Sequence, residues 1–327
     1  MLPQPHARWL EGFLGAPIPE ERASTCATCP MIETDPFGRP AFPADLKCCT
    51  FFPALPNFQV GALLADPDPR LDHGRSRVRE RIRAGNAVTP LGVSKPRAYH
   101  NLYGRGGFGE STALRCPYYR DGGCGVWSHR DAVCSTWFCK HDRGHFGFAF
   151  WQAAMKLLIA LEHAVAAKVA IELGIPGDAL EGLVPADVSR EAHPDYYDGV
   201  WAGWLGREEE FFVATSERVA GLDWAQAADW AKVDENELGS GLRRAHAALS
   251  EPVPDVVALG KLERLGESPT VVRLKSYSPY NPIDLPRAAA DALVDYEGRP
   301  TVDLGEIGLS EAMVRRLADH EILLHTK

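Results

Sequence analysis

The cysteines are the residues of this chain whose type and spacing most clearly indicate chemistry. All eight lie within residues 1–139, and the rest of the 327-residue chain has none. They are Cys26, Cys29, Cys48, Cys49, Cys116, Cys124, Cys134 and Cys139. Thiols gathered in one region either chelate metal or bridge one another. The spacing therefore indicates a metal centre or a disulfide framework.

The N-terminal sequence and the chain length favour metal binding over disulfides. Residues 1–14 include two prolines, a histidine and an arginine and no long apolar run, so we expect no export signal. Disulfides persist mainly in oxidising compartments, and a chain of this length can bury an ample core without cross-links. We therefore predict a metal-binding protein of the cytoplasm.

Thiolates of this number could hold iron–sulfur clusters or zinc. Cys26 and Cys29 suit either centre, because the turn between them points both sulfurs the same way. The side chains of the adjacent Cys48 and Cys49 diverge, so these two should serve different metals or different corners of one larger centre. Aromatic residues beside the thiols favour a dry iron–sulfur site over zinc. Eight thiolates permit two 4Fe-4S clusters, one cluster with spare thiols, or one cluster and a zinc ion.

Glycines, an arginine and histidines near the later cysteines are candidates for further roles. The backbone amides of Gly106, Gly107 and Gly109 could donate hydrogen bonds to cluster sulfides or to a nucleotide-like ligand. A simple flexible loop is the alternative for this segment. Arg130 is expected to neutralise an anionic cluster through a charge-assisted hydrogen bond. The histidines that could supply a ligand or carry a proton are His129, His141 and His145.

The cysteine arrangement resembles the YkgJ-like cysteine-cluster family, whose members are described as zinc- or iron-chelating proteins. That family has a C-x2-C pair, a Cys-Cys doublet, and later cysteines with an intervening arginine. The matching residues are Cys26, Cys29, Cys48, Cys49, Cys116, Cys124, Arg130, Cys134 and Cys139. In the family the doublet follows the first pair closely, whereas here a longer insertion separates Cys29 from Cys48. The resemblance covers residues 26–139 and implies a metal centre there.

The resemblance implies a metal centre more strongly than it implies a reaction. Flagellin lysine-N-methylases are similar to this family and combine such cysteines with S-adenosylmethionine, and other relatives are labelled iron–sulfur oxidoreductases. We therefore expect an iron–sulfur protein that is a redox or peptide- or protein-modifying enzyme, with S-adenosylmethionine as an additional cofactor in the methyl-transfer case. The alternatives are a non-catalytic, metal-stapled protein-binding module and a metal-handling protein.

The residues between and after the cysteines must position them. Their pattern predicts an α+β fold that is mostly helical and is divided into three domains. Residues 1–146 are rich in proline and glycine and predict a loop-rich cysteine domain stapled by metal. Residues 147–251 predict a helical domain, and residues 252–327 predict a small winged-helix-like module. The cysteine-free parts are expected to shape a cleft over the metal centre and to present a partner.

The helical domain has strong periodic signals. The apolar stretch from Phe148 to Leu173 predicts one long, largely buried helix that stops at Gly174. Further helices are predicted at 194–204, 207–219, 224–233 and 236–249. In the first domain, the arginine-rich stretch 75–83 predicts a helix with Val78 and Ile82 buried. Its basic face is either solvated or a site for an anion or an acidic partner.

The last 75 or so residues combine short strands and helices. We predict strands at 270–274 and 301–304, a helix at 285–296, and a final helix capped by Ser310. The segment 295–302 resembles the peptide-binding PqqD-like winged helices, which implies a peptide or protein partner. A small helical cap without a partner is the alternative. An extended peptide is expected to add to the strand at 270–274.

Charge and hydropathy exclude two classes of partner. The net charge of −9 argues against a general nucleic-acid binder, which normally presents a basic field. The chain has no apolar stretch long enough to cross a bilayer, so we expect no membrane span.

Overall fold

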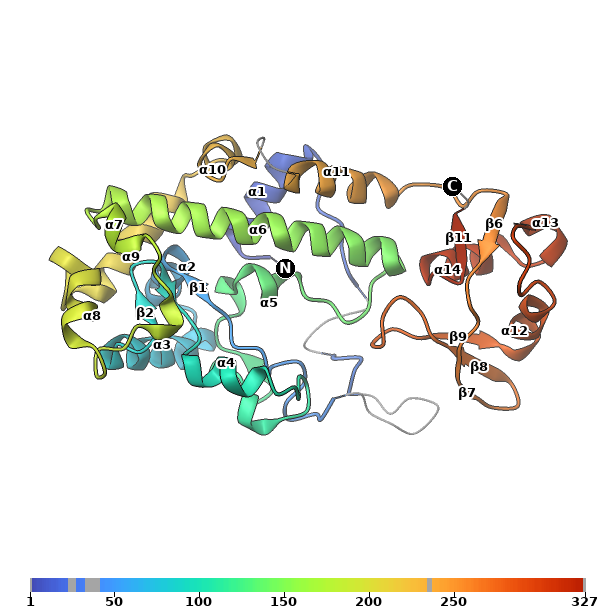
Figure 1. Ribbon diagram of the computed structural model, residues 1–327, viewed down its shortest axis with the longest axis horizontal. Coiled ribbons are helices and arrows are strands. Elements are labelled where there is room, and N and C mark those ends of the chain that lie inside the picture. The colour runs from blue at the N-terminus through green and yellow to red at the C-terminus, as the bar shows by residue number, and fades with distance from the viewer. Residues whose placement is uncertain (1, 23–27, 33–41, 234–236, 326–327) are drawn as a thin grey trace. The chain divides into compact units, whose positions relative to one another are not determined.

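The computed structural model describes residues 2–22, 28–32, 42–233 and 237–325 (Figure 1). Over these residues the protein is α+β and mostly helical, which confirms the predicted fold class at this level. The chain divides into two compact units. Unit 1 comprises Met1–Pro19, Phe42–Trp137 and Ala154–Ser240, and unit 2 comprises Glu20–Ala41, Phe138–Ala153 and Gly241–Lys327. The boundaries of these two units do not coincide with those of the three predicted domains. The division into three domains stays a prediction.

Unit 1 is built mainly from helices that pack around one apolar core. Helix α2 (Asn57–Ala65) packs against α9 (Glu208–Ala220). A Cβ at Gly61 would overlap the backbone of Phe212, so this close packing requires glycine. The remaining helices of unit 1 are α1 (Gln4–Leu14), α3 (Asp72–Ala84), α4 (Arg97–Tyr103), α5 (Ala132–Thr136), α7 (Gly177–Leu180), α8 (Pro194–Trp201) and α10 (Trp224–Trp230).

The strands described in unit 1 are very short and pair antiparallel. The first sheet has the order β1–β3–β2, and β4 and β5 form a separate hairpin. Their bounds are β1 (Leu55–Pro56), β2 (Val88–Thr89), β3 (Gly92–Val93), β4 (Tyr119–Arg120) and β5 (Gly123–Cys124). Strands of two residues have no side-chain periodicity of their own, so neighbouring loops and helices must hold them in place.

The long helix α6 (Gly144–Glu172), green in Figure 1, begins a turn earlier than the predicted helix and ends just before Gly174. The division between the units falls within this helix. Leu157, Leu158 and Leu161 are fully buried, as predicted from the apolar face. The arginine-rich helix is α3, and its Val78 and Ile82 are buried, which confirms that prediction as well.

The later helical predictions are confirmed in type and position. Helices α8, α9 and α10 and the helix α11 (Leu238–Ala248) lie at the four predicted places. Asp223 caps α10 by accepting a hydrogen bond from the Gln226 amide. Strong helical periodicity therefore located these elements well.

Unit 2 contains two three-stranded antiparallel sheets, drawn in orange and red in Figure 1. One sheet has the order β10–β6–β11 and the other β7–β8–β9. The strands are β6 (Val256–Leu259), β7 (Arg264–Glu267), β8 (Val271–Leu274), β9 (Ile283–Pro286), β10 (Val302–Asp303) and β11 (Leu323–His325). The shorter helices are α12 (Arg287–Val294), α13 (Leu304–Ile307) and α14 (Glu311–Asp319). Apolar residues from both sheets and from these helices form one core.

Three predictions for this region are confirmed and two are corrected. Strand β8 matches the predicted strand at 270–274, and β10 matches the predicted strand at 301–304. Ser310 caps α14 by accepting a hydrogen bond from the Met313 amide. However, Leu285 belongs to β9 rather than to the following helix. In addition, β8 is the central strand between β7 and β9, so both of its edges are paired. The expectation that a peptide adds to this strand is therefore wrong.

No helix in the described part of the chain is both long enough and apolar enough to cross a bilayer.

Candidate functional site

The structure separates the predicted metal ligands into two groups. Unit 1 contains Cys48, Cys49, Cys116, Cys124 and Cys134, which we call the unit 1 thiols. Unit 2 contains Cys29 and Cys139, both of which are buried. Cys26 lies outside the described residues. The unit 1 thiols are the larger group and are considered first.

The cysteine doublet lies directly beside Cys116. The Cys116 amide donates a hydrogen bond to the Cys49 carbonyl over 2.8 Å, and the Thr50 amide donates to the Cys48 carbonyl over the same distance. The Gly109 amide donates to the Thr50 hydroxyl over 2.7 Å. Backbone contacts therefore bring the doublet next to a cysteine that is distant in the sequence.

Tyr99, on the exposed helix α4, holds the turn at Thr50 through two further hydrogen bonds. Its hydroxyl donates to the Thr50 carbonyl and accepts a hydrogen bond from the Phe52 amide over 2.9 Å. Burial raises the pKa of the Tyr99 hydroxyl above its usual value, and the charges of Cys116 and Cys134 add to this shift. The phenol therefore belongs to the electrostatic surroundings of the thiols.

Cys134 lies on the short helix α5, whose N-terminus is held by two buried carboxyl groups. Asp131 accepts hydrogen bonds from the Cys134 amide over 2.9 Å and from the Ala54 amide over 3.0 Å. Glu162, on α6, accepts from the Ala132 amide over 2.9 Å. The first amides of a helix have no partner within the helix, so side-chain acceptors must satisfy them when they are buried. Both acidic residues therefore position the Cys134 backbone.

A buried polar network extends from Glu162 to α1. The Nε2 atom of His6 lies 2.9 Å from Glu162 Oε1, and its Nδ1 atom lies 3.2 Å from the Ser135 hydroxyl. Burial lowers the pKa of His6 to about 3 and raises the pKa of Glu162 well above its usual value. Because both shifts disfavour charge, the network anchors α5 as a neutral hydrogen-bonded group.

The unit 1 thiols influence one another electrostatically. Burial raises the pKa of Cys116, and the nearby charges of Cys124 and Asp131 raise it further. Burial also raises the pKa of Cys134, and the nearby charges of Asp131, Cys116 and Cys124 raise it further. A hydrogen bond to Cys49 and burial raise the pKa of Cys48. The raised pKa values of Cys48, Cys116 and Cys134 favour the neutral thiols unless a bound cation stabilises the thiolates.

Arg130 supplies positive charge near these thiols. Its guanidinium carbon lies 3.6 Å from the centre of the Trp127 ring, and the group donates to the carbonyls of Trp127 and Cys134. The Arg130 charge partly offsets the upward pKa shifts of Cys48 and Cys134. Its placement agrees with the expected role beside an anionic cluster, which stays a prediction.

The glycines proposed to bind a cofactor all adopt the left-handed backbone region. Gly106, Gly107 and Gly109 have φ values of 87°, 97° and 77°. A Cβ at Gly109 would overlap the ring of Phe42, whereas a Cβ at Gly106 would meet open space. Since the Gly109 amide already bonds to Thr50, packing accounts for this glycine. Cofactor binding by the three glycines stays a prediction.

The histidines proposed as ligands or proton carriers have partners of other kinds. In unit 1, His129 Nε2 lies 2.9 Å from Asp66 Oδ2. In unit 2, His141 Nδ1 lies 3.1 Å from the hydroxyl of Tyr277, and burial lowers the pKa of His141 to about 4. His145 Nδ1 lies 3.3 Å from the Asp319 carbonyl.

A half-buried carboxyl group supports the cysteine segment of unit 2. Glu21 accepts hydrogen bonds from the Asp142 amide over 2.6 Å and from the Trp151 indole over 2.8 Å. Burial raises the pKa of Glu21 to about 7, although both hydrogen bonds act in the opposite direction. Because Asp142 follows Cys139 closely, Glu21 helps to hold the chain beside that thiol.

The unit 1 thiols fit a metal centre by chemical type. Soft thiolates select zinc or iron–sulfur clusters, and Cys116 lies in an apolar core against which Cys49 and Cys124 pack. Over the described ranges, however, no three Cys, His, Asp or Glu side chains surround one point as a metal shell would require. The backbone therefore gathers suitable donors without arranging their sulfurs as a finished coordination sphere.

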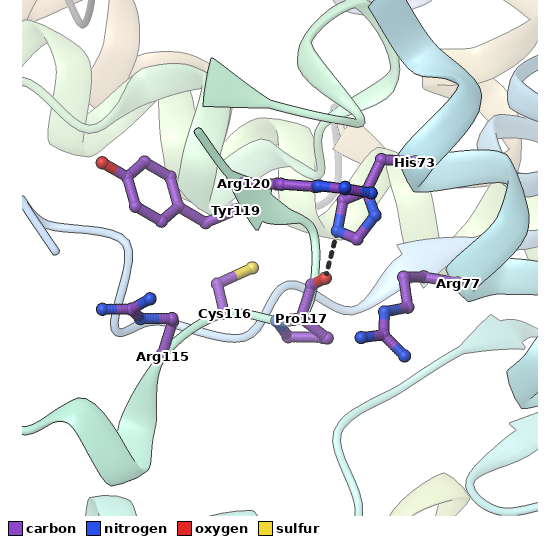
Figure 2. A pocket seen from close by; sticks show the side chains of 7 residues that line it. All are labelled: His73, Arg77, Arg115, Cys116, Pro117, Tyr119 and Arg120. Atoms are coloured by element: carbon purple, nitrogen blue, oxygen red, sulfur yellow. Dashed lines mark hydrogen bonds between the residues drawn. The ribbon is translucent and has the colours of Figure 1, made fainter. Parts of the chain in front are cut away.

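Cys116 also lines a surface pocket, which is the view in Figure 2. The cavity has a volume of about 290 Å³. Its lining residues are His73, Arg77, Arg115, Cys116, Pro117, Tyr119 and Arg120. The thiol segment is thus accessible to a small molecule on this side.

Sequence reasoning missed three supporting residues, namely Tyr99, Asp131 and Glu162. Two of them had a usable signal. Asp131 precedes Cys134 by one helical turn, the spacing of an N-cap residue. Glu162 lies on the apolar face of α6, where a carboxyl group requires a buried partner. Tyr99 had no signal, because its role depends on a long-range contact.

No protein-family model, curated protein or solved structure matches this chain. Its function must therefore be inferred from the residues and their geometry.

Proposed function

We propose that the unit 1 thiols hold an iron–sulfur cluster in a cytoplasmic redox or peptide- or protein-modifying enzyme. The observation that carries this proposal is the hydrogen bond between the Cys116 amide and the Cys49 carbonyl. It brings the doublet to the segment that continues to Cys124 and Cys134. A cluster needs thiolates from several segments in one place, and this contact supplies the convergence.

The surroundings of the thiols support a cluster. Cys116 belongs to the apolar core of unit 1, and Cys49 and Cys124 pack against it. A dry shell protects a redox cluster and tunes its potential. The buried guanidinium of Arg130 supplies positive charge beside Cys48 and Cys134, which favours thiolates. Zinc, the alternative metal, would use the same donors.

Access of a substrate to the metal centre distinguishes an enzyme from a protein whose metal only stabilises the fold. A catalytic centre keeps a route for substrate, whereas a structural site is closed. The pocket at Cys116 offers such a route, and it favours the enzyme. The burial of several thiols in the core favours the second candidate, a metal-stapled protein-binding module. Storage or delivery of metal is the third candidate, and the buried setting of these thiols makes it the weakest.

The family resemblance belongs to the same proposal. Under it, the chain is a YkgJ-like protein, and unit 2 contributes a winged-helix-like module that recognises a peptide or protein. The sequence β10–α13–α14–β11, with β10 and β11 both paired to β6, supports a compact module of strands and short helices. Residues outside the central strand β8 would have to provide the contact.

The proposal is tested by isolating the protein without oxygen and measuring iron, acid-labile sulfide and zinc per chain. We expect iron and sulfide in the wild type and a loss of most of both in Cys134→Ser. Cys29→Ser alters a thiol of unit 2: unchanged iron would confine the cluster to the unit 1 thiols, and lost iron would add Cys29 to its ligands. A colourless wild type with stoichiometric zinc would contradict the cluster, and unchanged iron in Cys134→Ser would contradict the ligand assignment.

A further inference from the structure

The pocket at Cys116 has an unusual concentration of positive charge. Three arginines and a histidine line it, and its described lining includes no carboxyl group. Figure 2 shows Arg77 to the right of Pro117, Arg120 above it with its side chain extending towards the His73 ring, and Arg115 to the left of Cys116. A concave surface with this composition is suited to an anion rather than to an apolar ligand.

The charge comes from two segments of the chain that meet at this pocket. His73 and Arg77 are four residues apart on α3, so they share one face of the helix. Arg115 and Arg120 flank the thiol segment and the start of the β4–β5 hairpin. His73 Nε2 bonds to the Pro117 carbonyl over 3.1 Å and joins the two walls. One member of the arginine-rich run is thus placed opposite two arginines from elsewhere in the chain.

A close backbone contact fixes the separation of the two walls. A Cβ at Gly74 would overlap the carbonyl of Gly125, and a Cβ at Gly125 would lie 2.8 Å from the Gly74 nitrogen. Only two glycines allow α3 to lie this close to the end of the hairpin. Because close packing resists displacement, the walls of the pocket are preorganised.

The arginines of the pocket have carboxylate partners outside its lining. Arg77 pairs with Glu80, Arg115 with Asp45, and Arg120 with Asp121. The Asp45 and Asp121 side chains are 72% and 88% exposed, and that of Glu80 is 46% exposed. Exposed ion pairs of this kind contribute only about 0–1 kcal/mol. A ligand with two or more negative oxygens can therefore compete for these guanidinium groups.

We infer that this pocket binds a phosphoryl group, either as free phosphate or as the phosphate end of a small molecule. Planar guanidinium groups bind phosphate oxygens through paired hydrogen bonds, and phosphate presents enough oxygens for several of them. A carboxylate has only two oxygens and would leave part of this donor set unused. A cavity of about 290 Å³ has room for a phosphate and a few further atoms.

The phosphate site is independent of the metal proposal. Its donors come from arginine side chains, none of which is among the proposed ligands or supports of the cluster. If both proposals hold, the site places a phosphorylated ligand against the segment that carries Cys116. If the metal proposal fails, the anion site stands on its own residues.

The test measures the affinity of the purified protein for inorganic phosphate by calorimetry at constant ionic strength. We expect saturable binding with a Kd of about 1 mM or tighter. Arg77→Gln and Arg120→Gln should each weaken binding roughly tenfold, since each removes one charged donor. Sulfate should compete with phosphate, and acetate should compete much less.

The matched control is Arg79→Gln, two residues from Arg77 on the same helix. Arg79 pairs with Glu209 and does not line the pocket, so its loss should change the affinity less than about twofold. Equal weakening in Arg79→Gln and Arg77→Gln would overturn the site, since it would mean diffuse attraction to a basic helix. Absence of saturable phosphate binding would also overturn it. Iron content measured on Arg77→Gln should match the wild type, which separates this test from that of the cluster.

Discussion

Unit 1 and unit 2 each use a carboxyl group to hold a cysteine-bearing segment, but the group is buried in unit 1 and half-buried in unit 2. In unit 1, Asp131 accepts from the amides of Ala54 and Cys134 and is only 3% exposed. In unit 2, Glu21 accepts from the amide of Asp142 and the indole of Trp151 and is half-buried. A carboxyl group that accepts two N–H hydrogen bonds thus occurs once in a closed core and once nearer the surface.

The difference in burial between the two carboxyl groups determines whether each one can change its charge near neutral pH. Burial raises the pKa of both groups, but Asp131 has no exposed route by which water could replace its hydrogen bonds. Glu21 has a pKa of about 7, so its charge changes within the physiological range. Asp131 is therefore a fixed support for Cys134, whereas Glu21 is a support whose strength depends on pH.

The largest effect is expected on removing the deeper support. Asp131→Ala leaves the buried amides of Ala54 and Cys134 without acceptors, and each such loss costs about 1–3 kcal/mol. We expect the free energy of unfolding to fall by about 3 kcal/mol, as measured by urea denaturation. Asp131→Asn keeps one of the two acceptor oxygens but places an NH2 group against the other amide, so it should lose an intermediate part of this stability. A loss well below 1 kcal/mol in Asp131→Ala would contradict the role of Asp131 as a hydrogen-bond acceptor.

An intermediate effect should come from the glycines beside the doublet, and it tests how rigid the unit 1 site is. Gly109→Ala places a Cβ against the Phe42 ring at a positive φ, and we expect a loss of about 2 kcal/mol. Gly106→Ala has the same backbone constraint but open space, so about 1 kcal/mol is expected. Thermal denaturation without added ligand checks both values. A larger loss in Gly106→Ala would show that packing is not what requires glycine at position 109.

The smallest effect is expected in unit 2 and depends on pH. The folded-state pKa of Glu21, about 7, exceeds its ordinary value of 4.5, so the folded protein binds the proton more tightly. Wild-type stability should therefore fall as the pH rises from 4.5 to 7. Glu21→Gln lacks this titration, so its stability should not show this fall, which is on the order of 1 kcal/mol because the group is partly exposed. It keeps only one of the two acceptor oxygens, so it also loses one hydrogen bond at every pH.

The control for this pH effect is Glu20→Gln, which alters the exposed neighbour of Glu21. Denaturation midpoints of both variants and the wild type should be compared at pH 4 and pH 8. A stability difference between Glu21→Gln and the wild type that is the same at both pH values would rule out the ionisation of Glu21 as its cause.

The sequence predicts the helices well because their apolar residues recur at helical spacing. Helices α6, α8 and α9 begin and end close to the expected residues, and helix α3 buries the two residues expected of it. The short strands carry no comparable signal, since two residues such as Leu55–Pro56 cannot alternate. The central position of β8 could not be predicted either, because it depends on which distant strands pair with it.

The candidate site was predicted by residue type but not by arrangement. Cysteine spacing identified the thiols, yet nothing in it placed Cys116 beside Cys49, a contact that depends on long-range backbone pairing. Nor did it predict that Cys139 would fall in a different unit from Cys134, since only a few residues separate them. The pocket arginines were visible only in part: the helical run contains Arg77, but its partners come from another segment.

Helix α4 and the glycine turn after it make unit 1 vulnerable to proteases at one defined place. None of the α4 residues is buried, and exposed positions continue through Arg105 to Gly106. Cleavage by a protease requires a segment to detach locally from its neighbours, which costs least where few side chains are packed. A trypsin cut after Arg105 would divide the polypeptide between Cys49 and Cys116. The doublet and the later thiols would then belong to separate peptides, held together only by noncovalent contacts.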